Sequence, residues 1–378
     1  MGLNFLIFLA SFLVAFICTP PLIRVSLRKN LTDAPGDLRK LHTRSIPTLG
    51  GVMIFAGTLF SFTLLVPTVI DASRAGLDGP TVAALAHDSN YLIASIILLF
   101  FIGVKDDIIG TAAIFKLLGH LIVGMILVLM GNIRITGFHG LFGIYSIPYW
   151  ASVFLSVFTY VVIINAINFI DGIDGLAAGV GLIASLAFGT WFSFAHSPVM
   201  SSLAFALSGS LMGFLVYNFS PAKIFMGDSG SLIIGLILAV LGIKLIEFDP
   251  AQLPASIVGI SRPLFVMCVL AYPLIDALRI VIYRSLKGSS PLEADRNHIH
   301  HALLDMKLNH RQISVVLYLY TAVMIVAAVL AQKLESTWAL VIVGGFAVIT
   351  LQLPILIRFR KRKTKSGIVK EMDRQQAI

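Results

Sequence analysis

Charged residues are scarce in this 378-residue chain: Asp, Glu, Lys and Arg make up 12% of it, against 57% hydrophobic residues. This composition excludes a soluble globular domain, in which about a quarter of the residues are charged. The mean hydropathy is +0.93, and the apolar residues form runs of about 20, the length at which a helix crosses a bilayer. The runs are continuous rather than alternating, which excludes a transmembrane β-barrel. The sequence therefore predicts an all-α, polytopic integral membrane protein.

Cysteine is nearly absent. Cys18 and Cys268 both lie in apolar runs, which argues against a disulfide framework or a thiolate zinc site. The sequence also lacks internal repeats and a separate soluble domain. No basic residue precedes the first apolar run, and Arg24, Arg28 and Lys29 follow it. We therefore interpret this run as a membrane anchor with its N-terminus outside, not as a cleaved signal peptide.

Eleven membrane spans are predicted from the apolar runs. They cover residues 3–23, 47–70, 90–105, 112–131, 149–168, 174–195, 201–217, 229–247, 262–283, 313–332 and 337–357. We expect residues 1–357 to form a single transmembrane domain and residues 358–378 to form a basic cytoplasmic tail.

The positively charged residues predict the orientation of the chain. The net charge of +9 would suggest a nucleic-acid partner in a soluble protein, but Lys and Arg of membrane proteins gather in cytoplasmic loops. If residues 24–46 face the cytoplasm, then 23 of the 28 Lys and Arg residues lie in inside segments. We therefore expect the N-terminus outside, the C-terminus inside, and no nucleic-acid partner.

Five polar motifs fall at the inner face under this topology. They are GVKDDIIG, NAINFIDGIDG, FMGDSGS, PLIDALR and DRNHIHH. Together they carry six aspartates: Asp106, Asp107, Asp171, Asp174, Asp228 and Asp276. A charged carboxylate at the bilayer centre costs roughly 3 kcal/mol on insertion scales. We therefore expect these groups to share a hydrated cavity, a cation, or both.

The run IINAINFIDGIDGLAAG is the densest of these motifs. Its four polar residues are spaced three apart: Asn165, Asn168, Asp171 and Asp174. On one continuous helix such a row drifts by roughly 60° per step and leaves a single face. Gly172 and Gly175 therefore predict that the helix breaks near Asp171. The plainer interpretation is that the asparagines join helices and the aspartates cap the next one.

Two adjacent carboxylates end the third predicted span. Asp106 and Asp107 lie about 100° apart on a helix, so they cannot present equally to one atom. We expect one to face a reacting group and the other to face a lysine, a cation or the backbone. Lys116 lies inside the next apolar run, where it can reach the membrane surface or bind phosphate. An ordinary polar helix end is the alternative.

FMGDSGS places Asp228 and Ser229 at the predicted start of a helix, between two glycines. Backbone N–H groups there can cradle a phosphate, and the helix dipole favours negative charge. A plain N-cap is the alternative. Phe225, just before this start, is either an interfacial aromatic or a platform on which a base stacks.

DRNHIHH combines one arginine with three histidines: Arg296, His298, His300 and His301. They can bind a transition metal or form a solvated loop, but Arg and His more naturally meet phosphate oxygens. Few cysteines and many Asp and Asn residues predict a hard cation, Mg²⁺ or Mn²⁺, and Mg²⁺ usually works with phosphates. The motifs together indicate phosphoryl transfer onto a lipid at the cytoplasmic membrane surface.

In order along the chain, KLHTRSIPTLGG, DD, NAINFIDGIDGLAAG, FMGDSGS and DRNHIHH resemble the motifs of the polyprenyl-phosphate N-acetylhexosamine-1-phosphate transferases. The resemblance covers nearly the whole chain. It implies a multi-pass enzyme of the bacterial inner (plasma) membrane, with residues 1–357 as the catalytic domain and a cytoplasmic active site. The implied reaction joins a UDP-sugar to undecaprenyl phosphate and releases UMP. Such products initiate cell-wall, teichoic-acid or O-antigen synthesis.

The same resemblance implies a role for each motif. Asn168 and Asp228 would hold Mg²⁺, with Mn²⁺ as an alternative, and Asp106, with Asp107 near it, would orient or deprotonate the lipid phosphate. The nucleotide would lie against Asp171, Asp174 and Phe225. Phosphate or sugar would meet Lys116, Arg296, His298, His300 and His301.

The donor sugar is predicted from the segment around the histidines. SPLEA followed by DRNHIHH resembles the N-acetylglucosamine branch, whereas the muramoyl-pentapeptide branch would carry adjacent histidines after Pro-Leu. We therefore expect UDP-N-acetylglucosamine. Other UDP-N-acetylhexosamines and UDP-MurNAc-pentapeptide stay open, as does a homodimer. An alternative function of a different class is that of a cation-coupled transporter. Such a transporter is expected to have inverted repeats and carboxylates near the membrane midplane, and the sequence shows neither.

Overall fold

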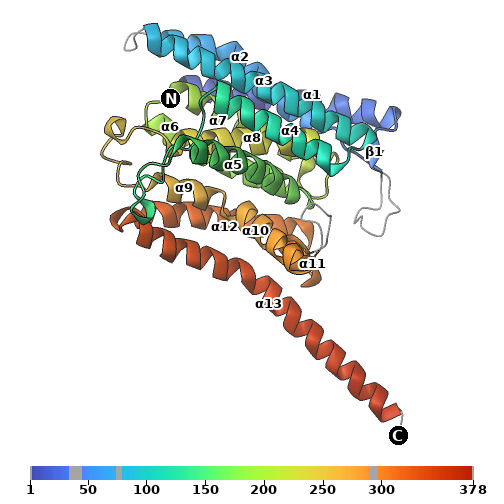
Figure 1. The fold of residues 1–378 in the computed structure, drawn as a ribbon. Helices are drawn as coiled ribbons and strands as arrows, with labels where there is room; N and C mark the ends of the chain where they lie inside the picture. Colours follow the sequence, from blue (N-terminus) through green and yellow to red (C-terminus); the bar gives the residue numbers. More distant parts are fainter. Residues whose placement is uncertain (1, 34–44, 74–78, 289–296, 377–378) are drawn as a thin grey trace.

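The computed structural model describes residues 2–33, 45–73, 79–288 and 297–376, which form a bundle of helices (Figure 1). In chain order the α-helices are α1 (Gly2–Arg28), α2 (Gly51–Ser73), α3 (Gly79–Ile109), α4 (Ala113–Met125), α5 (Tyr149–Phe169), α6 (Leu176–Phe194), α7 (Pro198–Asn218), α8 (Asp228–Ile246), α9 (Arg262–Val269), α10 (Ala271–Leu286), α11 (Ile299–Asp305), α12 (His310–Leu330) and α13 (Ser336–Gln376). A π-helix, η2 (Ile126–Met130), continues α4. Two short strands, β1 (Thr32–Asp33) and β2 (Ile46–Pro47), pair antiparallel.

Within the described ranges, nine helices are long and apolar enough to cross a membrane. The pair α9 and α10, bent by 75° at Leu270, makes a tenth if it counts as one span. The prediction of an all-α, polytopic membrane protein is therefore confirmed. Helix α3 contains the predicted span 90–105 but is not among those ten. The count of eleven spans and the orientation of the termini stay predictions.

The outer surface of the bundle is apolar, as a bilayer requires. Large apolar side chains of α1, α12 and α13 point away from the protein, among them Phe5, Leu330 and Ile349, which are 65%, 74% and 66% exposed. In water such a surface would cost roughly 25 cal/mol per Å², whereas lipid tails remove that cost. Helix α13 continues without a break across residue 358, the predicted start of the tail, and extends beyond the other helices (Figure 1).

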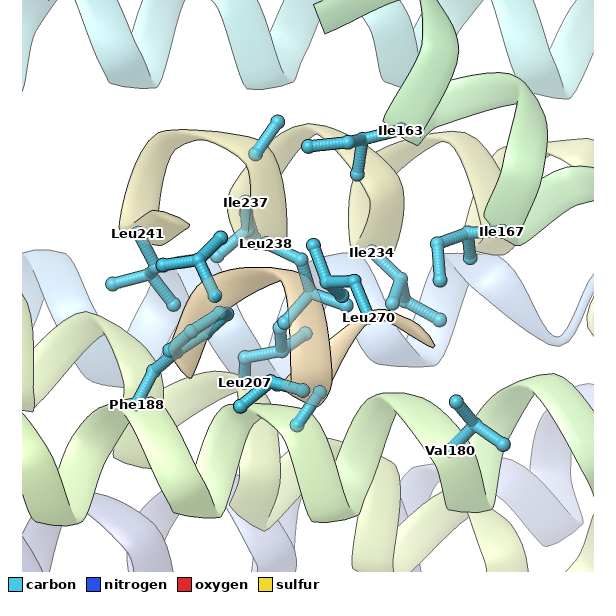
Figure 2. Packing of buried hydrophobic residues seen from close by; sticks show 14 of the residues in the cluster. Ile163, Ile167, Val180, Phe188, Leu207, Ile234, Ile237, Leu238, Leu241 and Leu270 are labelled. Atoms are coloured by element: carbon cyan, nitrogen blue, oxygen red, sulfur yellow. The ribbon is translucent and has the colours of Figure 1, made fainter. Parts of the chain in front are cut away.

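Helix α8 lies at the centre of the bundle. Every residue from Ser229 to Ile243 is buried, and a helix that is apolar all round is expected to be covered on all sides. Figure 2 shows its side chains between those of three neighbouring helices and of Leu270: Ile234, Ile237, Leu238 and Leu241 of α8, Ile163 and Ile167 of α5, Val180 and Phe188 of α6, and Leu207 of α7. The start of α8 is thereby fixed relative to its neighbours.

Glycines let the ends of three helices meet at the start of α8. A Cβ atom on Gly51, the first residue of α2, would lie 2.0 Å from the backbone nitrogen of Gly230. A Cβ atom on Gly103 of α3 would lie 2.6 Å from the Cα atom of Ser229. The chain before α2 also pairs with the chain before α8, since the Gly51 N–H donates to the Met226 carbonyl over 2.8 Å. These contacts bring α2, α3 and α8 together where the conspicuous polar motifs lie.

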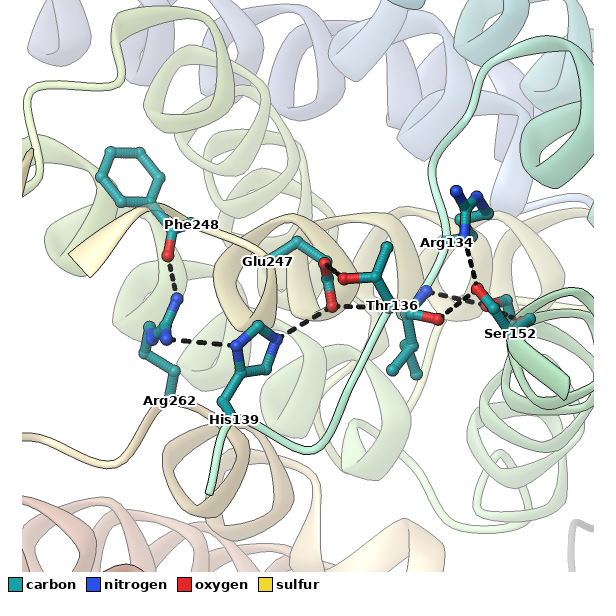
Figure 3. A network of polar contacts seen from close by, with 9 residues as sticks. Arg134, Thr136, His139, Ser152, Glu247, Phe248 and Arg262 are labelled. Atoms are coloured by element: carbon teal, nitrogen blue, oxygen red, sulfur yellow. Dashed lines mark hydrogen bonds and ion pairs between the residues drawn. The ribbon is translucent and has the colours of Figure 1, made fainter. Parts of the chain in front are cut away.

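At the opposite end of α8, Glu247 holds the segment between η2 and α5. Its carboxylate accepts a hydrogen bond from the Thr136 N–H over 2.9 Å and contacts the Nε2 atom of His139 over 3.0 Å. Arg262, at the start of α9, reaches the Nδ1 atom of His139 over 3.3 Å and also donates to the Phe248 carbonyl (Figure 3). This network joins the connection between η2 and α5 to the connection between α8 and α9, at the end of the bundle far from the aspartate-rich motifs.

Candidate active site

A lysine bridges two carboxylates at the start of α8. The Lys116 ammonium donates to Asp106 Oδ2 over 2.9 Å and to Asp228 Oδ2 over 2.7 Å. Asp106 lies in the last turn of α3 and Lys116 in the first turn of α4, so the short link between these helices brings the two together. Lys116 therefore does not simply reach for the membrane surface. The three side chains are between 16% and 24% exposed, which leaves them accessible to a ligand.

Asp107 faces the backbone of α8. Its Oδ1 atom accepts a hydrogen bond from the Asp228 N–H over 2.7 Å, and its Oδ2 atom accepts one from the Ser229 N–H over 3.1 Å. Gly227 precedes them with a φ of 72°, and a Cβ atom there would lie 2.6 Å from both Asp107 carboxylate oxygens. The predicted helix start at Asp228 is confirmed. The prediction that these N–H groups cradle a phosphate is wrong, because Asp107 already takes them.

The two asparagines of the central motif have different partners. Asn168 donates from Nδ2 to Asp228 Oδ1 and to the Ser231 hydroxyl, both over 2.9 Å. Asn165 donates to the Val161 carbonyl over 2.7 Å and lies 3.1 Å from the Nδ1 atom of His120. Asn168 thus joins the Asp228 site, whereas Asn165 links α5 to α4. Ser231 was not predicted to belong to this site. Its position one helical turn after Asp228 is the feature of the sequence that could have indicated it.

The predicted helix break is confirmed, since α5 ends at Phe169 and α6 begins at Leu176. In the turn between them, Asp174 accepts from the Ala222 N–H over 3.1 Å and pairs with His310 over 3.4 Å. Burial alone would raise the pKa of Asp174, but the bonds from His310 and Ala222 lower it overall. Asp174 therefore anchors the turn to the start of α12.

Asp171, in the same turn, belongs electrostatically to the carboxylate cluster. Burial raises its pKa well above the ordinary range, and the neighbouring carboxylates of Asp228, Asp107 and Asp174 raise it further. A cation beside Asp171 would reverse this effect. The contact of Asp171 and Asp174 with a nucleotide stays a prediction.

Asp276 does not join the other carboxylates. It is fully buried, and its Oδ2 atom lies 2.9 Å from the Nδ1 atom of His298, while its Oδ1 atom accepts from the Ile299 N–H over 2.9 Å. Arg279 pairs with it over 3.2 Å. The expectation that all six aspartates share one cavity or cation is therefore wrong for Asp276, which is neutralised by protein groups of the histidine segment.

The histidines pack against the turn that follows α5. The His298 ring lies 5.8 Å from the Phe169 ring and is stacked on His300 at 5.3 Å. His300 is buried, and a Cβ atom on Gly172 would lie 2.9 Å from its Nε2 atom. Burial, together with His301 nearby, lowers the pKa of His300 to about 3, so it is neutral.

The remaining predicted ligands are placed less fully. The His301 ring lies 4.4 Å from that of His300 and is half-buried. Phe225 is half-buried, and its N–H donates to the Pro47 carbonyl over 2.7 Å. Arg296 lies outside the described residues. Contacts of these groups, and of His298 and His300, with phosphate, sugar or base stay predictions.

The donor set at the start of α8 fits a hard divalent cation. In the described part of the chain, no three Asp, Glu, His or Cys side chains are close enough to hold a metal ion by themselves. Mg²⁺ does not need such a cage, because it usually keeps several waters and binds one or two carboxylates plus substrate phosphates. Asp228 supplies a carboxylate, and Asn168, which donates from Nδ2, keeps its Oδ1 atom for a cation. Asp171 adds a carboxyl group whose pKa is raised mainly by burial and further by its acidic neighbours.

Comparison with known proteins agrees with this centre. The model of glycosyl transferase family 4 matches residues 89–246, a stretch that contains Asp106, Lys116, Asn168 and Asp228. The chain is 30% identical over 92% of its length to the probable undecaprenyl-phosphate N-acetylglucosaminyl 1-phosphate transferase of Bacillus subtilis (strain 168), covering 89% of that protein.

Two other relatives carry similar names. The decaprenyl-phosphate N-acetylglucosaminephosphotransferase of Mycolicibacterium smegmatis is 30% identical, with 85% of this chain and 81% of that protein covered. The undecaprenyl-phosphate alpha-N-acetylglucosaminyl 1-phosphate transferase of Escherichia coli (strain K12) is 29% identical, with 82% and 78% covered. The resemblance inferred from the motifs is confirmed, and the chain belongs to glycosyl transferase family 4, the family of the polyprenyl-phosphate N-acetylhexosamine-1-phosphate transferases.

Proposed function

We propose that the protein transfers N-acetylglucosamine 1-phosphate from UDP-N-acetylglucosamine to undecaprenyl phosphate, giving undecaprenyl-diphospho-N-acetylglucosamine and UMP. The observation that carries the proposal is the centre in which Lys116 joins Asp106 to Asp228 beside Asn168. Relatives that align with most of the chain are named for this kind of transfer onto undecaprenyl or decaprenyl phosphate. The site would face the cytoplasm, since 23 of 28 Lys and Arg residues fall on that side of the predicted topology.

The reaction is a single displacement at phosphorus. An oxygen of the lipid phosphate attacks the β-phosphorus of the donor, the bond from that phosphorus to the bridging oxygen breaks, and UMP leaves with the electron pair. A phosphate monoester is largely ionised near neutral pH, because its second pKa is about 6. The nucleophile therefore needs little help from a base, and Asp106 acts by orienting it.

Three anionic phosphates must gather in a site that already holds carboxylates. The rate therefore depends on positive charge that offsets the repulsion between these groups. Lys116 is placed for this task, because its ammonium lies between Asp106 and Asp228 at the helix start. Asn168 and Asp228 would hold Mg²⁺, with Mn²⁺ able to take its place. The cation would neutralise charge on the donor diphosphate and on the departing UMP.

The test is UMP release by the detergent-purified protein with undecaprenyl phosphate and Mg²⁺, comparing UDP-N-acetylglucosamine with UDP-MurNAc-pentapeptide. We expect release with the first donor only, no release without the lipid, and loss of release after EDTA that added Mg²⁺ restores. Release only with the second donor would assign the protein to peptidoglycan synthesis. Release that persists in EDTA would contradict the metal assignment.

The alternatives have separate readouts. If neither donor gives UMP, other UDP-N-acetylhexosamines are tried in the same assay, because the segment that follows SPLEA would select the sugar. A cation-coupled transporter would instead move ions in proteoliposomes without UMP release. The carboxylates lie at helix ends rather than at a midplane break, which favours the transferase over the transporter.

A further inference from the structure

Asp276 is the most deeply buried carboxylate in the described part of the chain that the proposed reaction does not use. Its side chain is 0% exposed, and three groups surround it: His298 at 2.9 Å, the Ile299 N–H at 2.9 Å and Arg279 at 3.2 Å. Burying a carboxylate is unfavourable unless it is paired and hydrogen-bonded. A buried carboxylate in α10 that is paired and hydrogen-bonded on both oxygens therefore indicates a role beyond packing.

The three contacts fix the start of the histidine segment. Asp276 binds the side chain of His298 and the N–H of the next residue, so both the place and the rotation of this segment are set from α10. Arg279 strengthens the attachment, because it also donates to the Asn297 carbonyl. A side chain and a backbone group held by one carboxylate have little freedom to move independently.

The attachment also decides which nitrogen of His298 can meet a ligand. With Nδ1 held by the Asp276 carboxylate, Nδ1 carries a proton and only Nε2 is left for a ligand. The ring lies 5.8 Å from that of Phe169, which directly follows Asn168. The fixed histidine is therefore next to the end of α5, where the Asp228 site begins.

We propose that Asp276 is a positioning residue for the sugar-nucleotide donor: it holds His298 so that Nε2 faces the donor's phosphate or sugar. This inference rests on the proposed function and goes beyond it, because it identifies a residue of α10 that holds the segment DRNHIHH in place. In Asp276→Asn the amide keeps the shape and can still accept from the Ile299 N–H. Its Nδ2 group would face His298 Nδ1 as a donor, so His298 must switch tautomer and loses the support of a negative charge.

The experiment is a double-mutant cycle with Asp276→Asn and His298→Ala, measured as KM for the donor and for undecaprenyl phosphate. We expect Asp276→Asn to raise the donor KM about tenfold, as when a charge-assisted contact becomes a neutral one, with the lipid KM unchanged. In the His298→Ala background, Asp276→Asn should add less than about twofold, because residues acting through each other are not additive. Asp249→Asn, which removes an acidic cap at the other end of the bundle, is the matched control and should leave both KM values unchanged.

Several results would overturn the inference: a normal donor KM in Asp276→Asn, an equal rise in both KM values, or effects that multiply in the double variant. If Asp276→Asn does not yield folded protein, Arg279→Gln is measured instead, because it removes one partner of Asp276 and keeps the pair with His298. A smaller rise in donor KM is then expected, and no rise refutes the proposal.

A second readout does not depend on turnover. In protein labelled with ¹⁵N-histidine, the signal assigned to His298 by its loss in His298→Ala should show a protonated Nδ1, and Asp276→Asn should shift that proton to Nε2. An unprotonated Nδ1 in the unsubstituted protein would contradict the inference. Failure of every donor to give UMP would refute the proposed function, while this spectrum would still decide whether Asp276 sets the state of His298.

Discussion

Replacing each of two neighbouring aspartates by asparagine should separate catalysis from architecture. Asp107 accepts two backbone N–H groups at the start of α8, over 2.7 Å and 3.1 Å, whereas Asp106 makes an ion pair with Lys116 over 2.9 Å. We expect Asp107→Asn to lower stability and activity together. Asp106→Asn should lose most turnover while the protein stays as stable as before.

The magnitudes follow from these contacts. An asparagine at 107 can accept only one of the two N–H groups, and its own amide then faces the other. A hydrogen bond to a charged group is worth about 1.5–3 kcal/mol, and a carboxylate at a helix start adds about 0.3–1 kcal/mol. The loss for Asp107→Asn is therefore about 2–4 kcal/mol. For Asp106→Asn it is about 1 kcal/mol or less, because partly exposed ion pairs contribute little and the repulsion between Asp106 and Asp228 is also relieved.

Both properties can be measured on the same detergent-purified samples. Thermal unfolding followed by tryptophan fluorescence should show a clear fall in Tm for Asp107→Asn only, and UMP release should fall for both variants. Asp249→Asn serves as the control, since it makes the same exchange of carboxylate for amide at the far end of the bundle, where asparagine can still cap a helix start. An unchanged Tm for Asp107→Asn with lost activity would refute the architectural role, and near-normal turnover of Asp106→Asn would refute its role in the reaction.

Two further substitutions test the fold away from the site. Gly179→Ala should lower Tm, because its Cβ atom would lie 2.0 Å from the Tyr318 ring and overpacking costs about 1–3 kcal/mol; Gly345→Ala, with nothing within 4 Å, should not lower it. Glu247 has a lowered pKa, since bonds from His139 and Thr136 outweigh the effect of burial. Its stabilising effect is therefore present above the ordinary value of 4.5 and is lost as pH falls through the lower folded value. The Tm difference between the unsubstituted protein and Glu247→Gln should be constant at neutral pH and should disappear as the pH falls below 4.5. A difference that persists in acid would contradict a stabilising role of the ionised Glu247 carboxylate.

The sequence was sufficient for features that depend on local rules. Continuous apolar runs predicted the spanning helices, the two glycines predicted the break after Phe169, and FMGDSGS predicted a helix start at Asp228. Each of these depends on residues within one or two turns of each other. That Asp106 and Asp107 have different partners could also be predicted from their spacing alone, because adjacent residues on a helix cannot face the same way.

Pairings between distant segments could not be predicted. Lys116 and Asp228 are 112 residues apart, and nothing local distinguishes a lysine that forms this bridge from one that reaches for the membrane surface. The two N–H groups of α8 look free in the sequence, since Asp107 comes to them from another helix. Nor does the sequence show why Gly103 is a glycine, because the reason is the close approach of α3 to α8.

The charges at the start of α8 constrain the order in which ligands can arrive. Asp107 is compensated by the helix start, which leaves Asp106 and Asp228 around Lys116, an excess of one negative charge among these described residues. Donor and lipid are both anionic, and like charges at about 4 Å repel by about 4 kcal/mol near a protein surface. On the proposed function, neither phosphate can enter favourably until a divalent cation has balanced that excess. The cation must therefore bind before the donor diphosphate or together with it, and the lipid phosphate can approach Asp106 only afterwards.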